Sequence, residues 1–194
     1  METHEFEAIK ELYNEGNDTV PAHSFDEHVL EVYENAKELL EGEDVDEEVV
    51  KYSALLHDVG RKFSREGGHA EKGAEVAENF LIGELEKEEE LAKKVSECIR
   101  HHSNRPHLKP PTREAEILWA ADKLHATGAT GLFRFLLTMG AKDYSTEEAF
   151  EILRERVSDA EERAKEFGFE DLLSGLKSLK DFIEMYEEEN YASN

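Results

Sequence analysis

Apolar residues recur along most of this chain at intervals of three and four positions, the spacing that gathers them on one face of an α-helix. The stretch from about 24 or 26 to 41 shows this clearly, with Val29, Val32, Tyr33, Ala36, Leu39 and Leu40 in helical register. No alternating strand pattern and no hairpin signal is evident. We therefore predict an all-α protein, a bundle of roughly eight to nine helices.

The predicted helices are separated by short segments rich in glycine, proline or capping residues. Asp46 and Thr112 are suitable N-caps for the third and sixth helices, and Gly42 and Gly60 are expected to end the second and third. We see no domain boundary, and predict one domain over 1–194 with a core of roughly 23–136. The predicted helices cover about 5–14, 24–41, 46–58, 69–81, 87–102, 112–122, 131–139, 146–167 and 170–188.

The last two helices carry apolar stripes that are expected to dock them on the rest of the chain. These closing helices, 146–188, are charge-rich, and their charged faces are most simply solvated surface. The segments 61–68 and 103–111 are predicted to be loops, the first basic and the second bearing prolines. The walls of a substrate pocket are expected to come from such loops.

Charge excludes several kinds of partner. The net charge is −24, which argues against binding nucleic acid without sequence preference, because such binding relies on Lys and Arg. No apolar run is long enough for a transmembrane helix, and the acidic start lacks a signal core, so we expect a cytoplasmic protein. The single cysteine, Cys98, rules out an intrachain disulfide and a Cys-rich zinc site, and is expected to be buried.

Histidine and aspartate side chains stand at helix ends or on apolar helix faces, where a divalent transition metal is commonly bound. Each has a simpler interpretation on its own. A lone His on an apolar face is more often a core residue, and a His pair at a helix C-terminus interacts favourably with the helix dipole. An Asp within an apolar stretch must be paired, bound to metal or turned outward. The candidates are His28, His57, Asp58, His69, His101, His102 and Asp122.

Taken together and in this order, the candidates resemble the HD superfamily of metal-dependent phosphohydrolases. The resemblance covers roughly 23–136 and implies an all-helical fold. It also implies that a first metal is bound by His28, His57, Asp58 and Asp122. Asp58 could bridge to a second metal, for which His69, His101 and His102 are available. The segments that carry the resemblance are Phe25–Val32 (FDEHVLEV), Leu55–Arg61 (LLHDVGR), His69–Ala74 (HAEKGA) and Ala121–Leu124 (ADKL).

Basic side chains near these motifs are candidates for binding phosphate. Arg61 and Lys62 follow the His-Asp pair and suit phosphate oxygens, although ordinary surface charge is an equally good interpretation. Arg134 lies among apolar residues, so it either pairs with a structural carboxylate or lines the pocket. His125 stands where a subgroup of small HD proteins has a second acidic residue, and we count it with the substrate-binding candidates.

The resemblance implies hydrolysis of a phosphomonoester or phosphodiester, in a nucleotide or related small metabolite, by a metal-activated water. Asp58, Arg61 and Lys62 are the expected catalytic residues, with one or two divalent ions (Mn, Fe, Ni, Co, Zn or Mg). A homo-oligomer is possible. Two rival functions stay open: a di-iron oxygenase of the same fold, and a non-catalytic nucleotide-sensing module. A cyclic-dinucleotide substrate is disfavoured, because the Gly-Tyr signature of such enzymes does not follow His102.

Overall fold

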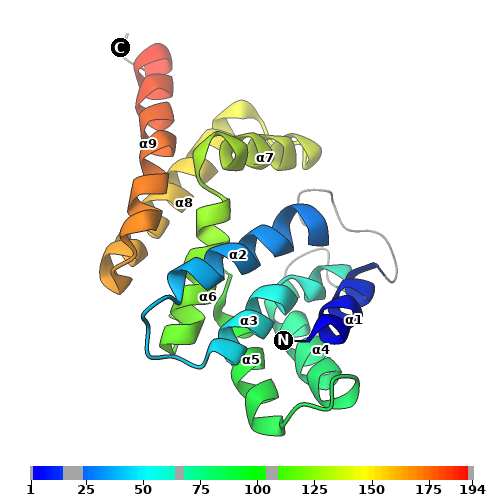
Figure 1. Cartoon of the computed structure of the whole chain (residues 1–194). Helices are drawn as coiled ribbons and strands as arrows, with labels where there is room; N and C mark the ends of the chain where they lie inside the picture. The colour runs from blue at the N-terminus through cyan, green and yellow to red at the C-terminus, as the bar shows by residue number, and fades with distance from the viewer. Residues whose placement is uncertain (1, 15–23, 64–67, 104–108, 192–194) are drawn as a thin grey trace. The chain divides into compact units, whose positions relative to one another are not determined.

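The computed structural model of the chain describes residues 2–14, 24–63, 68–103 and 109–191. Over these ranges it is helical and contains no strand, which confirms the predicted all-α class (Figure 1). The elements are α1 (Thr3–Asn14), η2 (Phe25–Val29), α2 (Leu30–Leu39), α3 (Glu47–Leu56), η3 (Val59–Lys62), α4 (His69–Gly83), α5 (Glu89–His101), α6 (Arg113–His125), α7 (Gly128–Ala141), α8 (Thr146–Phe167) and α9 (Glu170–Tyr191).

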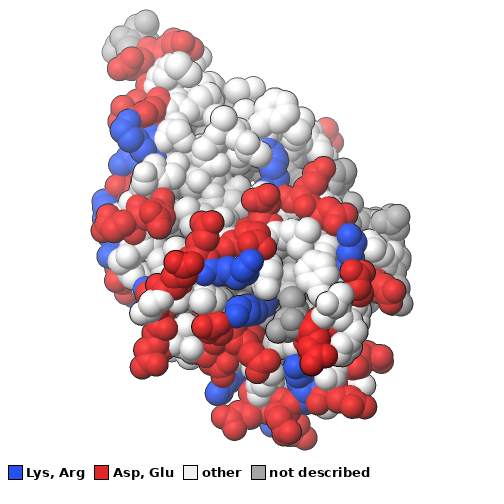
Figure 2. Space-filling view, viewed as in Figure 1, with Lys and Arg blue, Asp and Glu red and all other residues white. Residues whose placement is uncertain are grey.

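Contacts divide the chain into two compact units, Met1–Asp122 and Lys123–Asn194, and each is described by itself. The single domain predicted for 1–194 stays a prediction. Among the described helices, none combines the length and apolar character needed to cross a membrane. Figure 2 shows acidic side chains over much of the visible surface, in keeping with the net charge of −24.

Side-chain caps begin the helices where the sequence predicts them. The Asp46 carboxylate accepts a hydrogen bond from the Val49 amide at 3.4 Å, and the Thr112 hydroxyl accepts one from Ala115 at 3.3 Å. These bonds satisfy backbone N–H groups that have no partner within the helix. Both predicted N-caps are confirmed.

The predicted second and third helices differ from the observed ones in a way that matters for the site. The second begins as a turn of π-helix, η2, before α2 continues it. The third ends at Leu56, two residues early, and Gly60 lies inside the following turn η3 instead of ending the helix. A Cβ at Gly60 would overlap the carbonyl oxygen of His69 and the backbone nitrogen of Gly73. Glycine therefore allows η3 to pack against the backbone of α4.

The core of the first unit surrounds α3, which contacts α2 and α5. Every residue of α3 from Val49 to Leu56 is buried except Lys51, so the helix lies inside the unit. Cys98 of α5 is buried as predicted, and burial is the main reason that the pKa of its thiol is raised to about 12. The helix thus delivers His57 and Asp58 into an interior position, where unpartnered polar groups are costly.

The second unit consists of the C-terminal end of α6 followed by α7, α8 and α9. The predicted apolar stripes are buried except for Phe182, which is half-buried, and α8 packs on α9 and α9 on α7. The Ser145 hydroxyl and the Glu148 carboxylate form a reciprocal capping box at the start of α8, and Gly168 ends that helix in the left-handed conformation. Local sequence therefore defines both ends of α8.

Candidate metal centre

Separate segments of the first unit bring imidazoles and carboxylates to one place. The turn η2 carries His28, the end of α3 leads into His57 and Asp58, α4 begins with His69, and His102 follows α5. The side chains of His28, His57, Asp58 and His102 are at most 5% exposed. Polar groups of this kind are seldom buried unless they are hydrogen-bonded, paired or bound to an ion.

The first group consists of His28, His57 and Asp58, each of which offers a ligand atom within 4.8 Å of the others. The His28 Nε2 atom lies 3.1 Å from His57 Nε2 and 3.3 Å from Asp58 Oδ2. Asp122, near the end of α6, approaches the same atom, with Oδ1 3.6 Å from His28 Nε2. The structure thus brings together all four residues that the resemblance implies for a first metal.

A second group lies on the other side of the Asp58 carboxylate. Asp58 Oδ1 is 3.7 Å from His102 Nε2 and 3.9 Å from His69 Nε2, and these three residues also offer ligand atoms within 4.8 Å of one another. Asp58 therefore directs one oxygen toward each group. A carboxylate that faces two sets of imidazoles has the geometry needed to bridge two ions.

Backbone carbonyls orient two of the imidazoles. His57 Nδ1 is 2.8 Å from the Ala54 carbonyl oxygen, and His102 Nδ1 is 2.6 Å from the Ile99 carbonyl oxygen. A carbonyl only accepts hydrogen bonds, so each Nδ1 carries the proton and donates, which leaves the Nε2 lone pair facing Asp58. Such an arrangement is typical of metal-binding histidines.

Protonation also suits metal binding. Burial is the main reason that the pKa of His57 is lowered to about 3; the neighbouring His28 and His102 contribute in the same direction, and the charge of Asp58 opposes them. Burial likewise lowers the pKa of His69 to about 4, and the charge of Arg61 adds to the effect. Both imidazoles are therefore neutral at pH 7, the form that binds metals. His69 Nε2 is buried and has no hydrogen-bond partner within the described residues. This donor set fits a divalent ion.

The two basic candidates beside the centre have different partners. Arg61 Nε forms an ion pair with Asp58 Oδ2 at 2.6 Å, while its side chain stays about one-third exposed. The Lys62 ammonium instead donates to the carbonyl oxygen of Leu12 in α1. Arg61 therefore contacts the centre directly through Asp58, and a phosphate-binding role for Lys62 stays a prediction.

The adjacent histidines of α5 also separate. His102 belongs to the second group, whereas His101 Nδ1 lies 2.9 Å from the Glu97 carbonyl oxygen and 3.4 Å from the Glu97 carboxylate. The groups of ligand atoms found among the described residues do not include His101. Its predicted role as a ligand therefore has no support from this geometry.

Two further candidates lie in the second unit. Arg134 is half-buried rather than buried among apolar residues, which weakens the argument that it needs an anion partner. His125 is also half-buried. Their substrate-binding roles stay predictions. The predicted pocket loops fall partly outside the described residues, at 64–67 and 104–108.

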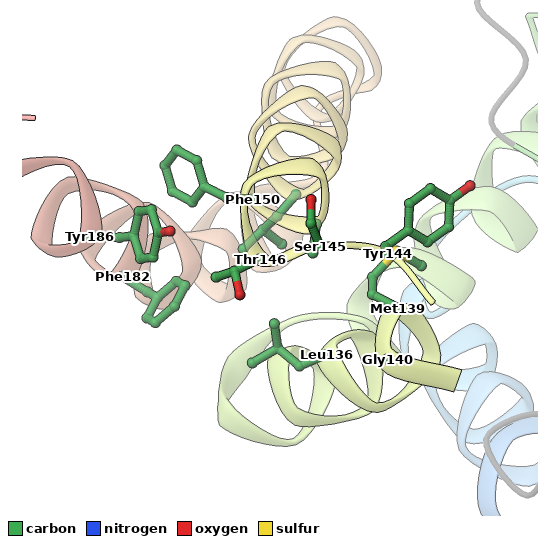
Figure 3. Close-up of a pocket in the computed structure, with 11 residues that line it drawn as sticks. Leu136, Met139, Gly140, Tyr144, Ser145, Thr146, Phe150, Phe182 and Tyr186 are labelled. Atoms are coloured by element: carbon green, nitrogen blue, oxygen red, sulfur yellow. The ribbon is translucent and has the colours of Figure 1, made fainter. Parts of the chain in front are cut away.

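A cavity of about 190 Å³ lies between helices of the second unit (Figure 3). Apolar and aromatic side chains form most of its lining, and none of the lining residues is charged or a histidine. A metal or a phosphate would find no strong ligand there. The described lining includes Leu136, Met139, Tyr144, Phe150, Leu153, Phe182 and Tyr186.

Comparisons with known proteins identify the family and the fold of the chain. The model of a family described as HD domain matches residues 25–127. The crystal structure of a predicted HD superfamily hydrolase from an uncultured Thermotogales bacterium is 30% identical, with a TM-score of 0.55 over 87% of this chain and 92% of that one. No similar sequence was found among curated proteins.

Two further crystal structures share the fold at lower identity. YpgQ of Bacillus subtilis, in complex with ADP, is 20% identical with a TM-score of 0.66, over 96% of this chain and 97% of that one. An HD-superfamily hydrolase from Bacillus thuringiensis is 21% identical with a TM-score of 0.67, over 97% of each chain. At this level of identity, the two structures support the fold alone.

Proposed function

The chain belongs to the HD domain family, and we propose that it is a metal-dependent phosphohydrolase acting on a phosphomonoester or phosphodiester. One observation carries this proposal: Asp58 lies between His28 and His57 on one side and His69 and His102 on the other. The family and its hydrolase relatives support a hydrolase in general terms. The bond, the substrate and the residue roles are our inference.

The proposed ligands follow the two groups. His28, His57, Asp58 and Asp122 would hold a first ion. Asp58, His69 and His102 would hold a second. When bound, such an ion (manganese, iron, nickel, cobalt, zinc or magnesium) supplies an activated water as nucleophile and offsets the charge of phosphoryl oxygens.

Arg61 has the geometry for a role with substrate. Its guanidinium is paired with Asp58 Oδ2 through Nε, and its partial exposure leaves other N–H groups accessible. Guanidinium groups bind phosphate oxygens with two parallel hydrogen bonds, so Arg61 can hold a phosphoryl group next to the ligands. The buried imidazoles around Asp58 exclude bulk water, which strengthens these electrostatic contacts.

We infer that the substrate is a nucleotide or a related small metabolite. YpgQ, which has the same fold, is known in complex with ADP, and this supports a phosphorylated small-molecule ligand here. The net charge of −24 repels polyanions such as nucleic acids. A small phosphate compound needs only the local positive charge of the metal and Arg61.

Metal analysis and a panel of phosphatase and phosphodiesterase substrates, assayed with each divalent ion in turn, would test the proposal. We expect activity that EDTA abolishes and that a specific ion restores. The variant Asp58→Asn should lose metal binding and at least about 1000-fold in activity, because it removes the shared carboxylate charge. Asp159→Asn, an exposed aspartate of α8, is the matched control and should behave as wild type.

Three results would contradict the proposal. The first is a protein that binds no divalent ion, and the second is an Asp58→Asn variant that keeps its activity. The third is retained iron with oxygen uptake, which would favour the di-iron oxygenase. A protein that binds metal and nucleotide but hydrolyses nothing would instead indicate a sensing module.

A further inference from the structure

Helix α1 contacts both of the segments that deliver ligands to the centre. It lies before residues 25–127, the part of the chain that matches the HD domain. Its buried side chains include Ile9 and Tyr13, four residues apart on one helix face. This face packs within the first unit, so α1 is part of the structure around the metal centre.

The first contact is with η2, the turn that carries His28. The ring of Phe25, the first residue of η2, has its centroid 5.6 Å from that of Phe6 and 5.3 Å from that of Tyr13. Lys10 adds an ion pair with Asp26 at 3.0 Å. Since Phe25 stands three residues before His28, this aromatic cluster fixes the turn from which His28 projects.

The second contact is with the segment from Asp58 to Lys62. The Leu12 carbonyl accepts the hydrogen bond from Lys62, and the next residue, Tyr13, is 4% exposed. Burial raises the pKa of Tyr13 well above its ordinary value, and the negative charge of Asp58 raises it further, while the backbone of Asp58 and Val59 acts in the opposite direction. Because Tyr13 directly follows Leu12, the hydrogen bond from Lys62 holds this part of α1 beside the Asp58–Lys62 segment, and the influence of Asp58 and Val59 on the hydroxyl agrees with that position.

This hydroxyl has no hydrogen-bond partner of ordinary geometry within the described part of the chain. A buried polar group in that condition costs about 1–3 kcal/mol, so a phenylalanine would satisfy the packing better. The presence of tyrosine instead of phenylalanine therefore points to a role for the hydroxyl oxygen other than packing. The sequence offers only the buried stripe of α1 as a signal, and no motif points to Tyr13.

We propose that Tyr13 is a positioning residue for the metal centre. Its ring, held against Phe25, sets the distance between the His28 turn and the Asp58 segment, and its hydroxyl stabilises that segment when Asp58 engages the metal. This inference rests on the proposed function, because it needs a metal at Asp58. Substitution of a residue that orients metal ligands without binding the metal itself commonly lowers metal affinity by about 10–100-fold.

Titration calorimetry with Mn²⁺ on the full chain tests this role without an activity assay. The variant Tyr13→Phe keeps the ring and removes only the hydroxyl, and we expect its Mn²⁺ affinity to fall about 10-fold. The matched control is Tyr52→Phe, which removes another buried hydroxyl of the first unit, one that lies near Glu5 and Lys87. Its Mn²⁺ affinity should stay within about 2-fold of wild type.

The melting temperature of each metal-free variant separates folding from positioning. Weaker Mn²⁺ binding by Tyr13→Phe alone, with similar melting temperatures for both variants, supports the role. Equal affinity for Tyr13→Phe and wild type, or an equal loss in both variants, would overturn it. If Tyr13→Phe does not fold, Phe6→Leu decides by the same measurement, because it loosens the same cluster at η2. Failure of the wild-type protein to bind Mn²⁺ would instead overturn the proposed function, and the positioning role with it.

Discussion

The two units differ in what they bury and what they expose. The buried polar and charged residues found among the described residues all belong to Met1–Asp122: Glu5, His28, Ser53, His57, Asp58, Ser96 and His102. The second unit has the opposite character, because most of the exposed large apolar side chains lie there: Phe133, Leu136, Leu137, Tyr144, Met185 and Tyr191.

This contrast separates packing from chemistry. Burial of a polar side chain is unfavourable unless a partner or an ion compensates for the lost water. The first unit carries that cost at the cluster of His28, His57, Asp58, His69 and His102, where desolvation keeps His57 and His69 neutral. The second unit carries no such cost in its apolar cavity. The difference favours the first unit as the place of catalysis, and the following substitutions test it from the largest expected effect to the smallest.

Gly60, where η3 approaches the backbone of α4, should be the position most sensitive to substitution. Gly60→Ala would force its Cβ into the backbone at His69 and Gly73, neither of which can move without shifting α4. We expect a loss of about 3 kcal/mol in the free energy of unfolding, together with weaker Mn²⁺ binding, because His69 is one of the displaced residues. Urea denaturation and calorimetry measure the two effects.

Gly83→Ala is the control for this change. A Cβ at Gly83, the last residue of α4, meets nothing within 4 Å. The free energy of unfolding of the Gly83→Ala protein should therefore stay within about 1 kcal/mol of wild type. Equal stability of the Gly60 and Gly83 variants would show that the η3–α4 contact is not the constraint described above.

The neighbouring histidines of α5 offer the next comparison. His102→Ala removes an imidazole whose Nε2 faces Asp58, and should lower Mn²⁺ affinity and activity by at least about 10-fold. His101→Ala removes a side chain engaged with Glu97, and should change both by no more than about 2-fold. A larger effect of His101→Ala than of His102→Ala would show that His101, and not His102, belongs to the second group.

This pair also marks the limit of what the sequence predicts. Helix positions and N-caps follow from local signals, and the resemblance points to His28, His57, Asp58 and Asp122 from the sequence alone. Two adjacent histidines at a helix end point about 100° apart, so helical rotation and the Ile99 carbonyl decide between them. Motif order alone leaves that choice open.

Other features depend on contacts between segments that are distant in sequence. Gly60 looks like a helix terminator until the backbone of α4 is seen beside it, and nothing in the sequence around Lys62 predicts its hydrogen bond to the carbonyl oxygen of Leu12. Tyr13 and Asp58, which influence each other in the folded chain, are 45 positions apart in the sequence. Periodicity reports which face of a helix is buried, but not what that face meets.

Acid should distinguish a buried carboxylate of the first unit, Glu5, from a half-buried one of the second, Glu161. Burial opposes ionisation of Glu5, but Lys87, whose ammonium lies 2.7 Å from Glu5 Oε1, and the Glu2 amide outweigh it, so the pKa of Glu5 falls to about 2. This folded-state pKa lies below the unfolded value. The resulting stability is therefore present above about pH 4.5 and is lost as the pH falls toward 2.

Glu5→Gln should accordingly lower the free energy of unfolding by roughly 1–2 kcal/mol at pH 6, and this difference from wild type should shrink as the pH approaches 2. Urea denaturation at several pH values measures it. The counterpart in the second unit is Glu161→Gln, whose lysine partners Lys165 and Lys180 have side chains 61% and 43% exposed, against 21% for Lys87. It should cost no more than about 0.5 kcal/mol. A difference for Glu5→Gln that does not vary with pH would rule out this ion pair as its source.

The smallest effect is expected in the second unit, at the cavity. Gly140 lines it near the end of α7, and an added Cβ would meet nothing within 4 Å. Gly140→Ala should raise stability by about 0.5–1 kcal/mol, since alanine favours the helix and loses less backbone entropy on folding. For a chain of this size, that corresponds to a melting temperature about 1–4 °C higher in scanning calorimetry.

Gly168→Ala is the contrasting change in the same unit, because φ is 79° there and alanine should lower the melting temperature. Neither variant should alter Mn²⁺ affinity if the metal centre draws its ligands from the first unit alone. A stabilised Gly140→Ala protein with changed Mn²⁺ affinity would mean that the apolar cavity is coupled to the centre. The cavity would then have to be counted as part of the catalytic apparatus, and the division between a chemical unit and a packing unit would fail.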